Sequence, residues 1–147
     1  MLPSRHVIAS LSLGIVLWFF TKSIYASILC FVSGVLIDID HFLDYIIHRG
    51  LRGITFRKVY KASKETGDQE GEDVFKKLYL ILHSGEIVFI LWALTLYTRN
   101  IYVLALSLGY TLHLIMDCIG NKLYPSAYFV LWRVIRKFEI EHFFKKK

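Results

Sequence analysis

The chain has 147 residues, which bounds it to one domain at most. Hydrophobic residues make up 55% of the chain and its mean hydropathy is +0.47, whereas a soluble domain is usually about 45–50% apolar. The chain is nevertheless well charged, because 20% of its residues are charged and its formal net charge is +6. Disorder, collagen and coiled coil are excluded by the aromatic content of 16%, by the presence of only two prolines and by the lack of a heptad pattern. The two cysteines, Cys30 and Cys118, lie in apolar runs, which does not suit a secreted disulfide framework. A small basic membrane protein remains.

The first two apolar runs are short and close together. They cover residues 7–20 and 24–37, and each is shorter than the roughly 20 residues that cross a bilayer. The second run can extend to about Ile47, and the first can gain a turn at each end, which predicts helices over about residues 6–21 and 24–47. A cleaved signal peptide, with Ser-Ile-Tyr-Ala before Ser27, is the alternative for the first run.

The last two apolar runs are long enough to span a membrane. Leu78–Tyr97 contains only His83 and Glu86 as ionisable residues, and residues 101–119 contain only two. They predict helices over 78–97 and 101–119. Residues 1–147 are therefore expected to form one all-α, polytopic membrane domain with four transmembrane helices.

Two segments outside these runs are rich in charge. Residues 48–77 mix lysine and arginine with acidic residues and include Thr-Gly-Asp-Gln-Glu-Gly, which is typical of a flexible solvated loop. The tail, residues 126–147, places Tyr128, Leu131, Trp132, Ile135 and Phe138 at helical spacing, with Arg133, Arg136 and Lys137 off that face. This pattern predicts a C-terminal amphipathic interfacial helix in the headgroup plane. Its alternative is a helix packed on the end of the bundle.

The positive charge is unevenly distributed between the two sides of this topology. Sixteen of the eighteen Lys and Arg residues fall on the side of the two termini and of loop 48–77, and only Lys22 and Arg99 fall on the other. The positive-inside rule places both termini in the cytoplasm. Anionic membrane lipids account for the basic charge, so membrane lipids are expected partners and nucleic acid is not.

Ionisable residues inside apolar spans are costly and usually functional. Here they are histidines and carboxylates, and never lysine or arginine. The second run ends in Asp38, Asp40, His41 and Asp44, and Asp44 is expected to be a solvated position. His83 and Glu86 are three residues apart on one face of the third predicted helix, and His113 and Asp117 are four apart on the fourth. With His6 ahead of the first run, all four helices are expected to bring a histidine to one layer inside the cytoplasmic face.

Histidines with carboxylates suit Zn²⁺ best, and Mn²⁺ or Fe²⁺ next. The candidate metal ligands are His6, Asp38, His41, His83, His113 and Asp117, and this number allows a two-metal centre. Metal binding lowers the pKa of a bound water, and Glu86 or Asp40 is then the candidate catalytic carboxylate. Helix–helix hydrogen bonding by each histidine, and haem ligation by His83 and His113, are the alternatives.

These residues resemble the membrane-bound metal-dependent hydrolases of the YdjM-like inner-membrane family. The resemblance rests on an N-terminal histidine, an Asp-Ile-Asp-His signature after the second span, a His-Ser pair and a Gly-Tyr-x-x-His-x-x-x-Asp motif; here these are His6, Asp38–His41, His83-Ser84 and Gly109–Asp117. The chain departs from the family at Ile37, where the family has proline, and in the wide separation of His48-Arg49-Gly50 from His83-Ser84. The resemblance implies a multi-pass protein of the cytoplasmic membrane.

Together these observations predict a metal-dependent hydrolase at the cytoplasmic membrane face. The depth of the ligands favours an amphiphilic substrate with a phosphoester or ester group. A membrane metal-binding or metal-transport protein without hydrolase activity needs the same ligands and is the alternative. A structural four-span protein with hydrogen-bonded histidines is a third hypothesis.

Overall fold

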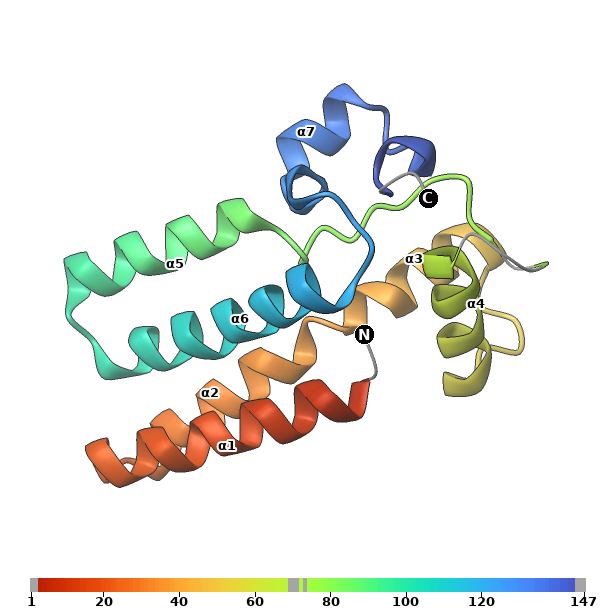
Figure 1. Ribbon diagram of the computed structural model, residues 1–147. Coiled ribbons are helices and arrows are strands. Elements are labelled where there is room, and N and C mark those ends of the chain that lie inside the picture. Colours follow the sequence, from red (N-terminus) through yellow and green to blue (C-terminus); the bar gives the residue numbers. More distant parts are fainter. Residues whose placement is uncertain (1–2, 69–71, 73, 145–147) are drawn as a thin grey trace. The chain divides into compact units, whose positions relative to one another are not determined.

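The computed structural model describes residues 3–68, 72 and 74–144 (Figure 1). Over these residues the chain forms seven α-helices and two short 3-10 helices. It forms no β-strand there, and extended backbone pairs only in the isolated bridges Lys77–Glu139 and Leu123–Phe144. The predicted all-α class is confirmed.

The chain divides into two compact units. The first unit comprises Met1–Ile37 and Ser84–Gly120, and the second comprises Asp38–His83 and Asn121–Lys147. The expectation of one membrane domain stays a prediction, and each unit is described below by itself.

The first unit is built from two pairs of consecutive helices. These are α1 (Pro3–Thr21) with α2 (Ile24–Leu36), and α5 (Gly85–Thr98) with α6 (Ile101–Gly120). Helix α2 packs on both α1 and α6, and α5 packs on α6. Ser23 caps α2 by accepting a hydrogen bond from the amide of Ala26 at 3.3 Å, which lets the second helix begin soon after the first ends.

Small residues allow the helices of the first unit to approach closely. A Cβ atom on Gly109 of α6 would overlap the carbonyl oxygen of Cys30 and the hydroxyl of Ser33 on α2. A Cβ atom on Gly34 would in turn overlap Ser10 of α1. Contacts between small residues are the usual way in which helices pack in membranes, because large apolar side chains are solvated as well by lipid tails as by another helix.

The polarity of α1 in the first unit is reversed relative to a helix of a soluble protein. On α1 the buried face consists of His6, Ser10, Gly14 and Leu17, while Ile8, Ile15 and Phe19 are more than half exposed. Within the described part of the chain, three segments are long and apolar enough to span a membrane: Pro3–Thr21, Ile24–Arg49 and Ile101–Gly120. These features are consistent with a membrane protein.

The second and third predicted spans differ from the structure. The segment predicted as 24–47 is broken by a turn at Ile37 and Asp38 into α2 and α3 (Ile39–Arg49). The helix predicted over 78–97 begins only at Gly85, so α5 has 14 residues. The reason is that side chains of the second unit, distant in sequence, form hydrogen bonds with the backbone of residues 79–83, and this segment is not helical.

The second unit contains α3, α4 (Phe56–Asp68), η1 (Pro125–Tyr128), α7 (Val130–Ile135) and η2 (Ile140–His142). The expectation of a flexible loop over 48–77 is wrong for residues 56–68. Helix α4 packs on α3 and buries Val59, Ala62 and Thr66 on one face. The hydroxyl of Thr66 accepts a hydrogen bond from the amide of Phe75 at 3.1 Å. Part of the Thr-Gly-Asp-Gln-Glu-Gly stretch lies outside the described residues.

The tail does not form the single amphipathic helix that the spacing predicts. Helix α7 has only six residues, and Lys137 and Phe138 adopt left-handed backbone conformations that end it. Its polarity also differs, because Arg133 is buried whereas Leu131 and Ile135 are 71% and 75% exposed. Side-chain packing in the second unit, described next, explains the burial of Arg133.

Candidate metal centre

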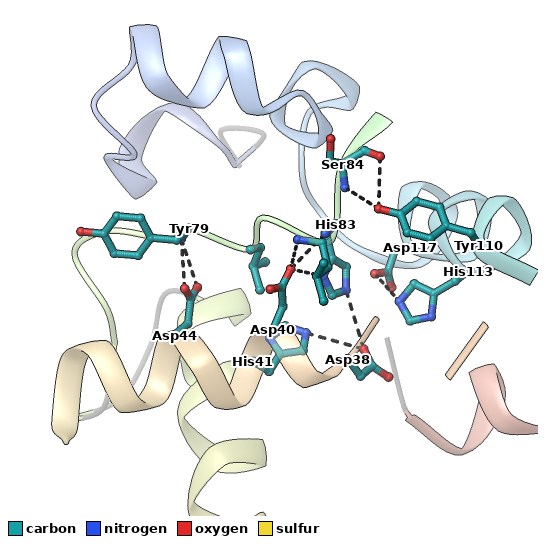
Figure 2. Close-up of polar contacts among 12 residues, drawn as sticks. Asp38, Asp40, His41, Asp44, Tyr79, His83, Ser84, Tyr110, His113 and Asp117 are labelled. Carbon is teal, nitrogen blue, oxygen red and sulfur yellow. Dashed lines mark hydrogen bonds and ion pairs between the residues drawn. The ribbon is translucent and has the colours of Figure 1, made fainter. Parts of the chain in front are cut away.

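Three predicted ligands meet in the first unit. His113 and Asp117 lie one turn apart on α6, with His113 Nε2 3.5 Å from a carboxylate oxygen of Asp117 (Figure 2). The other oxygen of Asp117 is 3.2 Å from Nε2 of His6, on α1. The two imidazole rings stack with centroids 4.1 Å apart, and all three side chains are at most 3% exposed. One candidate ligand atom from each lies within 4.8 Å of the others.

A backbone contact determines which nitrogen of His113 carries hydrogen. Nδ1 of His113 is 2.8 Å from the carbonyl oxygen of Gly34 on α2. A carbonyl oxygen can only accept, so Nδ1 donates and Nε2 of the neutral ring has a lone pair that faces Asp117. Histidines that ligate metals are typically held in this way, with the second ring nitrogen donating to a carbonyl or carboxylate. The close approach of α2 and α6 at Gly109 places Gly34 for this contact.

The electrostatics of this cluster favour a shared cation. The lone pair of His113 and the carboxylate of Asp117 are both acceptors, and a proton or a metal ion is needed to join them. Nδ1 of His6 is also buried and has no hydrogen-bond partner among the described residues. Two imidazoles and one carboxylate fit the ligand chemistry of Zn²⁺.

Three further predicted ligands meet in the second unit. One carboxylate oxygen of Asp38 is 3.8 Å from Nε2 of His41 and 3.7 Å from Nε2 of His83. The two imidazole rings are 5.2 Å apart. Nδ1 of His83 lies 3.3 Å from Asp40. If Nδ1 donates to this carboxylate, His83 presents the lone pair of Nε2 toward Asp38, an arrangement like that of His113 and Asp117 (Figure 2).

The segment that carries His83 is held on both sides by buried charged groups. On α3, Asp40 accepts hydrogen bonds from the amides of Leu82 and His83, and Asp44 accepts from the amide of Tyr79 at 3.1 Å. Figure 2 shows Asp40 and Asp44 on successive turns of α3, facing this segment. Asp40 and Asp44 are each 2% exposed, so the expectation that Asp44 is solvated is wrong. Asp40, predicted to be catalytic, has contacts that suit a positioning residue.

Arg133 binds the carbonyl groups of the segment that carries His83, while Asp40 and Asp44 bind its amides. The sequence did not predict Arg133 as a functional residue. Its guanidinium donates hydrogen bonds to the carbonyl oxygens of Tyr79, Leu80 and His83, and its Nε donates to that of Ala127. The side chain is buried because these carbonyl groups satisfy its donors. The one signal in the sequence was its isolation in the apolar segment 130–135.

Glu86 lies at the start of α5 in the first unit. Its carboxylate accepts a hydrogen bond from the hydroxyl of Ser84 at 2.6 Å, and the amide of Ser84 is 3.4 Å from the phenol oxygen of Tyr110. The expectation that His83 and Glu86 share a helical face is wrong, because α5 begins after His83. The role of Glu86 as a general base stays a prediction.

The fold and the site define an all-helical protein with helices apolar enough to cross a membrane and with buried His/Asp clusters that could hold a metal ion. No protein-family model, curated protein or solved structure matches the chain. The resemblance to the YdjM-like hydrolases therefore stays a prediction.

Proposed function

We propose that this protein is a membrane-embedded, metal-dependent hydrolase that binds a divalent cation, with Zn²⁺ the first candidate and Mn²⁺ or Fe²⁺ next. The observation that carries the proposal is the buried cluster of His6, His113 and Asp117, whose nitrogen and oxygen atoms face one another. Three protein ligands are the usual number in catalytic zinc sites, which keep the fourth position for water or substrate.

The protein groups have distinct roles in this proposal. His6 and His113 are the nitrogen ligands, and Asp117 is the oxygen ligand that faces both. The carbonyl of Gly34 orients His113. A bound Zn²⁺ would supply Lewis acidity and lower the pKa of a bound water. Glu86 remains the candidate general base, and its hydrogen bond to Ser84 restricts its orientation.

The second unit offers a second donor set. Asp38, His41 and His83 are assigned as further candidate ligands, because two imidazole nitrogens lie within 4 Å of one carboxylate oxygen. Asp40 is assigned as a positioning residue that holds His83 and fixes its tautomer. The metal content of separate variants of the two sets distinguishes their contributions.

The membrane setting suggests the substrate class. The ligands of the first unit are carried by α1 and α6, which are both candidate membrane spans. An amphiphilic substrate, such as a lipid bearing a phosphoester or ester group, can approach such a site from the bilayer. The asymmetry of Lys and Arg favours cytoplasmic termini in a cytoplasmic membrane. A multi-pass protein of the cytoplasmic membrane is also what the resemblance to the YdjM-like family implies.

Burial of the cluster favours a second candidate function. His6, His113 and Asp117 are 2%, 0% and 3% exposed, and a metal ion enclosed in this way suits binding or transport without hydrolysis. The two functions require the same ligands and differ in turnover.

Elemental analysis of the purified protein tests metal binding. After treatment with a chelator and reconstitution with Zn²⁺, we expect the wild type to retain zinc after desalting and His113→Ala to lose the zinc held by the cluster of the first unit. His142→Ala is the matched control, because His142 is a histidine with a 43% exposed side chain. Equal zinc content in the wild type and His113→Ala would contradict the assignment.

Turnover then separates the two functions. Wild type, His113→Ala and His142→Ala are incubated in vesicles of phosphatidic acid and phosphatidylcholine, and released phosphate and fatty acid are measured. Zinc-dependent release by the wild type and His142→Ala alone supports a hydrolase. Zinc binding without release supports the metal-binding alternative.

A further inference from the structure

Helix α3 in the second unit has reversed polarity. Asp40 and Asp44 are each 2% exposed, whereas Ile39, Leu43 and Ile47 form a stripe that is 50%, 49% and 60% exposed. In a helix that faces water, carboxylates occupy the exposed face and apolar residues occupy the buried one. Helix α3 does the opposite.

Helix α7 of the same unit repeats this reversal. Arg133 is 2% exposed, and Leu131, Val134 and Ile135 are 71%, 53% and 75% exposed. Monomeric soluble proteins rarely expose contiguous apolar patches, and such patches mark membrane or protein interaction sites. We call the exposed side chains of α3 and α7 the apolar faces of the second unit.

The buried charges do not need water at these faces. The carboxylates of Asp40 and Asp44 accept from backbone amides of residues 79–83, and the guanidinium of Arg133 donates to carbonyls of the same segment. Charges of opposite sign therefore lie on either side of one short segment, and their hydrogen bonds are internal. Such an interior is compatible with a surrounding that offers no hydrogen bonds.

Helix α4 shows that the reversal is local. It buries Val59 and Ala62 and exposes Arg57, Lys61 and Lys64, as expected for a helix in contact with water. The second unit thus has one helix suited to water and two helices with apolar faces.

We propose that the apolar faces of α3 and α7 lie in the hydrocarbon region of a lipid bilayer. Two further observations favour lipid over a second copy of the chain. Helix α3 is the C-terminal part of the apolar segment Ile24–Arg49, which as a whole is a candidate membrane span. Exposed cations also lie at the end of each apolar face. Arg49 is the last residue of α3, and Arg136 and Lys137 directly follow α7, and such cations suit lipid phosphates at the boundary.

This inference goes beyond the proposed function and is independent of it, because no residue of the apolar faces is a proposed ligand. It assigns α7 as well as α3 to the hydrocarbon region, whereas the sequence predicts a transmembrane helix that extends only to about Ile47 and a tail that lies in the headgroup plane. A metal-free protein would have the same apolar faces.

Site-directed spin labelling tests the proposal. Single cysteines replace Leu43, Ile47, Leu131 or Ile135 in a Cys118→Ser background, in which Cys30 is fully buried. Lys61→Cys and Lys64→Cys on α4 are the matched controls. In nanodiscs of phosphatidylcholine and phosphatidylglycerol, we expect the ratio of oxygen to nickel-chelate accessibility to be several-fold higher at the four apolar positions than at the controls.

Two results would overturn the proposal. High nickel-chelate accessibility at the apolar positions would place them in water. Low accessibility to both reagents would mean that protein, such as a second copy, covers them. Size-exclusion profiles check that each labelled variant folds, and Ile39→Cys or Val134→Cys replaces one that does not.

Discussion

The imidazole rings of His6 and His113 stack with centroids 4.1 Å and planes 22° apart, and both rings face Asp117. The rings come from the first and last helices of the first unit, and α1 and α6 are in direct contact. The cluster therefore forms only when these helices pack together. Metal binding and the packing of the first unit should consequently change in parallel.

Replacing the shared carboxylate should weaken metal binding. We expect Asp117→Asn to reduce the affinity for Zn²⁺ by more than about tenfold, because the amide removes the negative charge that faces both histidines. Competition with a zinc-binding dye in detergent measures the affinity. Asp68→Asn, at an exposed carboxylate 3.5 Å from Lys122, should bind as the wild type does. An equal loss in both variants would count against the cluster.

The tautomer of His113 can be observed directly. We expect ¹⁵N NMR of histidine-labelled, metal-free protein to show Nδ1 of His113 protonated, because this nitrogen donates to the carbonyl of Gly34. Zn²⁺ should shift the Nε2 resonance and leave the Nδ1 proton in place. The signal of His142 should be unaffected by Zn²⁺ and serves as a control. A resonance of His113 with hydrogen on Nε2 alone would refute the assignment.

Enlarging Gly109 should separate α2 from α6. A Cβ atom there would overlap the Cys30 carbonyl, so we expect Gly109→Ala to destabilise the protein by about 1–3 kcal/mol. The shift should also lengthen the contact of Gly34 with His113 and weaken Zn²⁺ binding. Unfolding in mixed micelles of increasing denaturing-detergent fraction measures the stability.

The control for this prediction is Gly67→Ala. Gly67 lies in α4, and apart from its chain neighbours and the helix's own backbone no atom of the described residues comes within 4 Å of the position that a Cβ atom would take there. Alanine should therefore be neutral or stabilising by about 0.5–1 kcal/mol. If the two alanine variants change stability equally, helix approach at Gly109 is not the cause.

Arg133 should be needed for the order of the segment before α5. Lysine cannot form the same set of hydrogen bonds to Tyr79, Leu80 and His83, so we expect Arg133→Lys to destabilise the protein by about 2 kcal/mol or more. Hydrogen exchange of the amides of residues 79–83 should accelerate. The exposed Arg136→Lys should change stability by no more than about 0.5 kcal/mol. Unchanged exchange in Arg133→Lys would show that the carboxylates of α3 alone hold the segment.

Several features of the site could be predicted because they depend only on the spacing of residues along one helix. The spacing of His113 and Asp117 places them on one helical face, and the structure confirms this contact. The four predicted helices were expected to bring their histidines to one layer, and in the first unit His6, ahead of the first apolar run, does lie beside His113 and Asp117 of the fourth. Depth along a helix follows from residue count, so this inference needed no tertiary information.

Other features depended on contacts between distant parts of the chain. The sequence of residues 78–84 is as apolar as a helix requires, but its backbone groups bind Asp40, Asp44 and Arg133 instead of one another. The same contacts decide that Asp44 is buried and that Arg133 faces inward. Helical periodicity cannot predict such bonds, because each partner lies tens of residues away.

The sequence by itself determined an all-helical, apolar chain with histidines and carboxylates set within its hydrophobic runs, because hydropathy and spacing are properties of consecutive residues. Only the tertiary structure decided how these residues group. It joined His6, His113 and Asp117 in one unit and Asp38, His41 and His83 in the other, and it assigned Asp40 to the backbone of residues 79–83. The physical reason is that a buried polar group is satisfied by whichever partner folding brings within hydrogen-bonding distance.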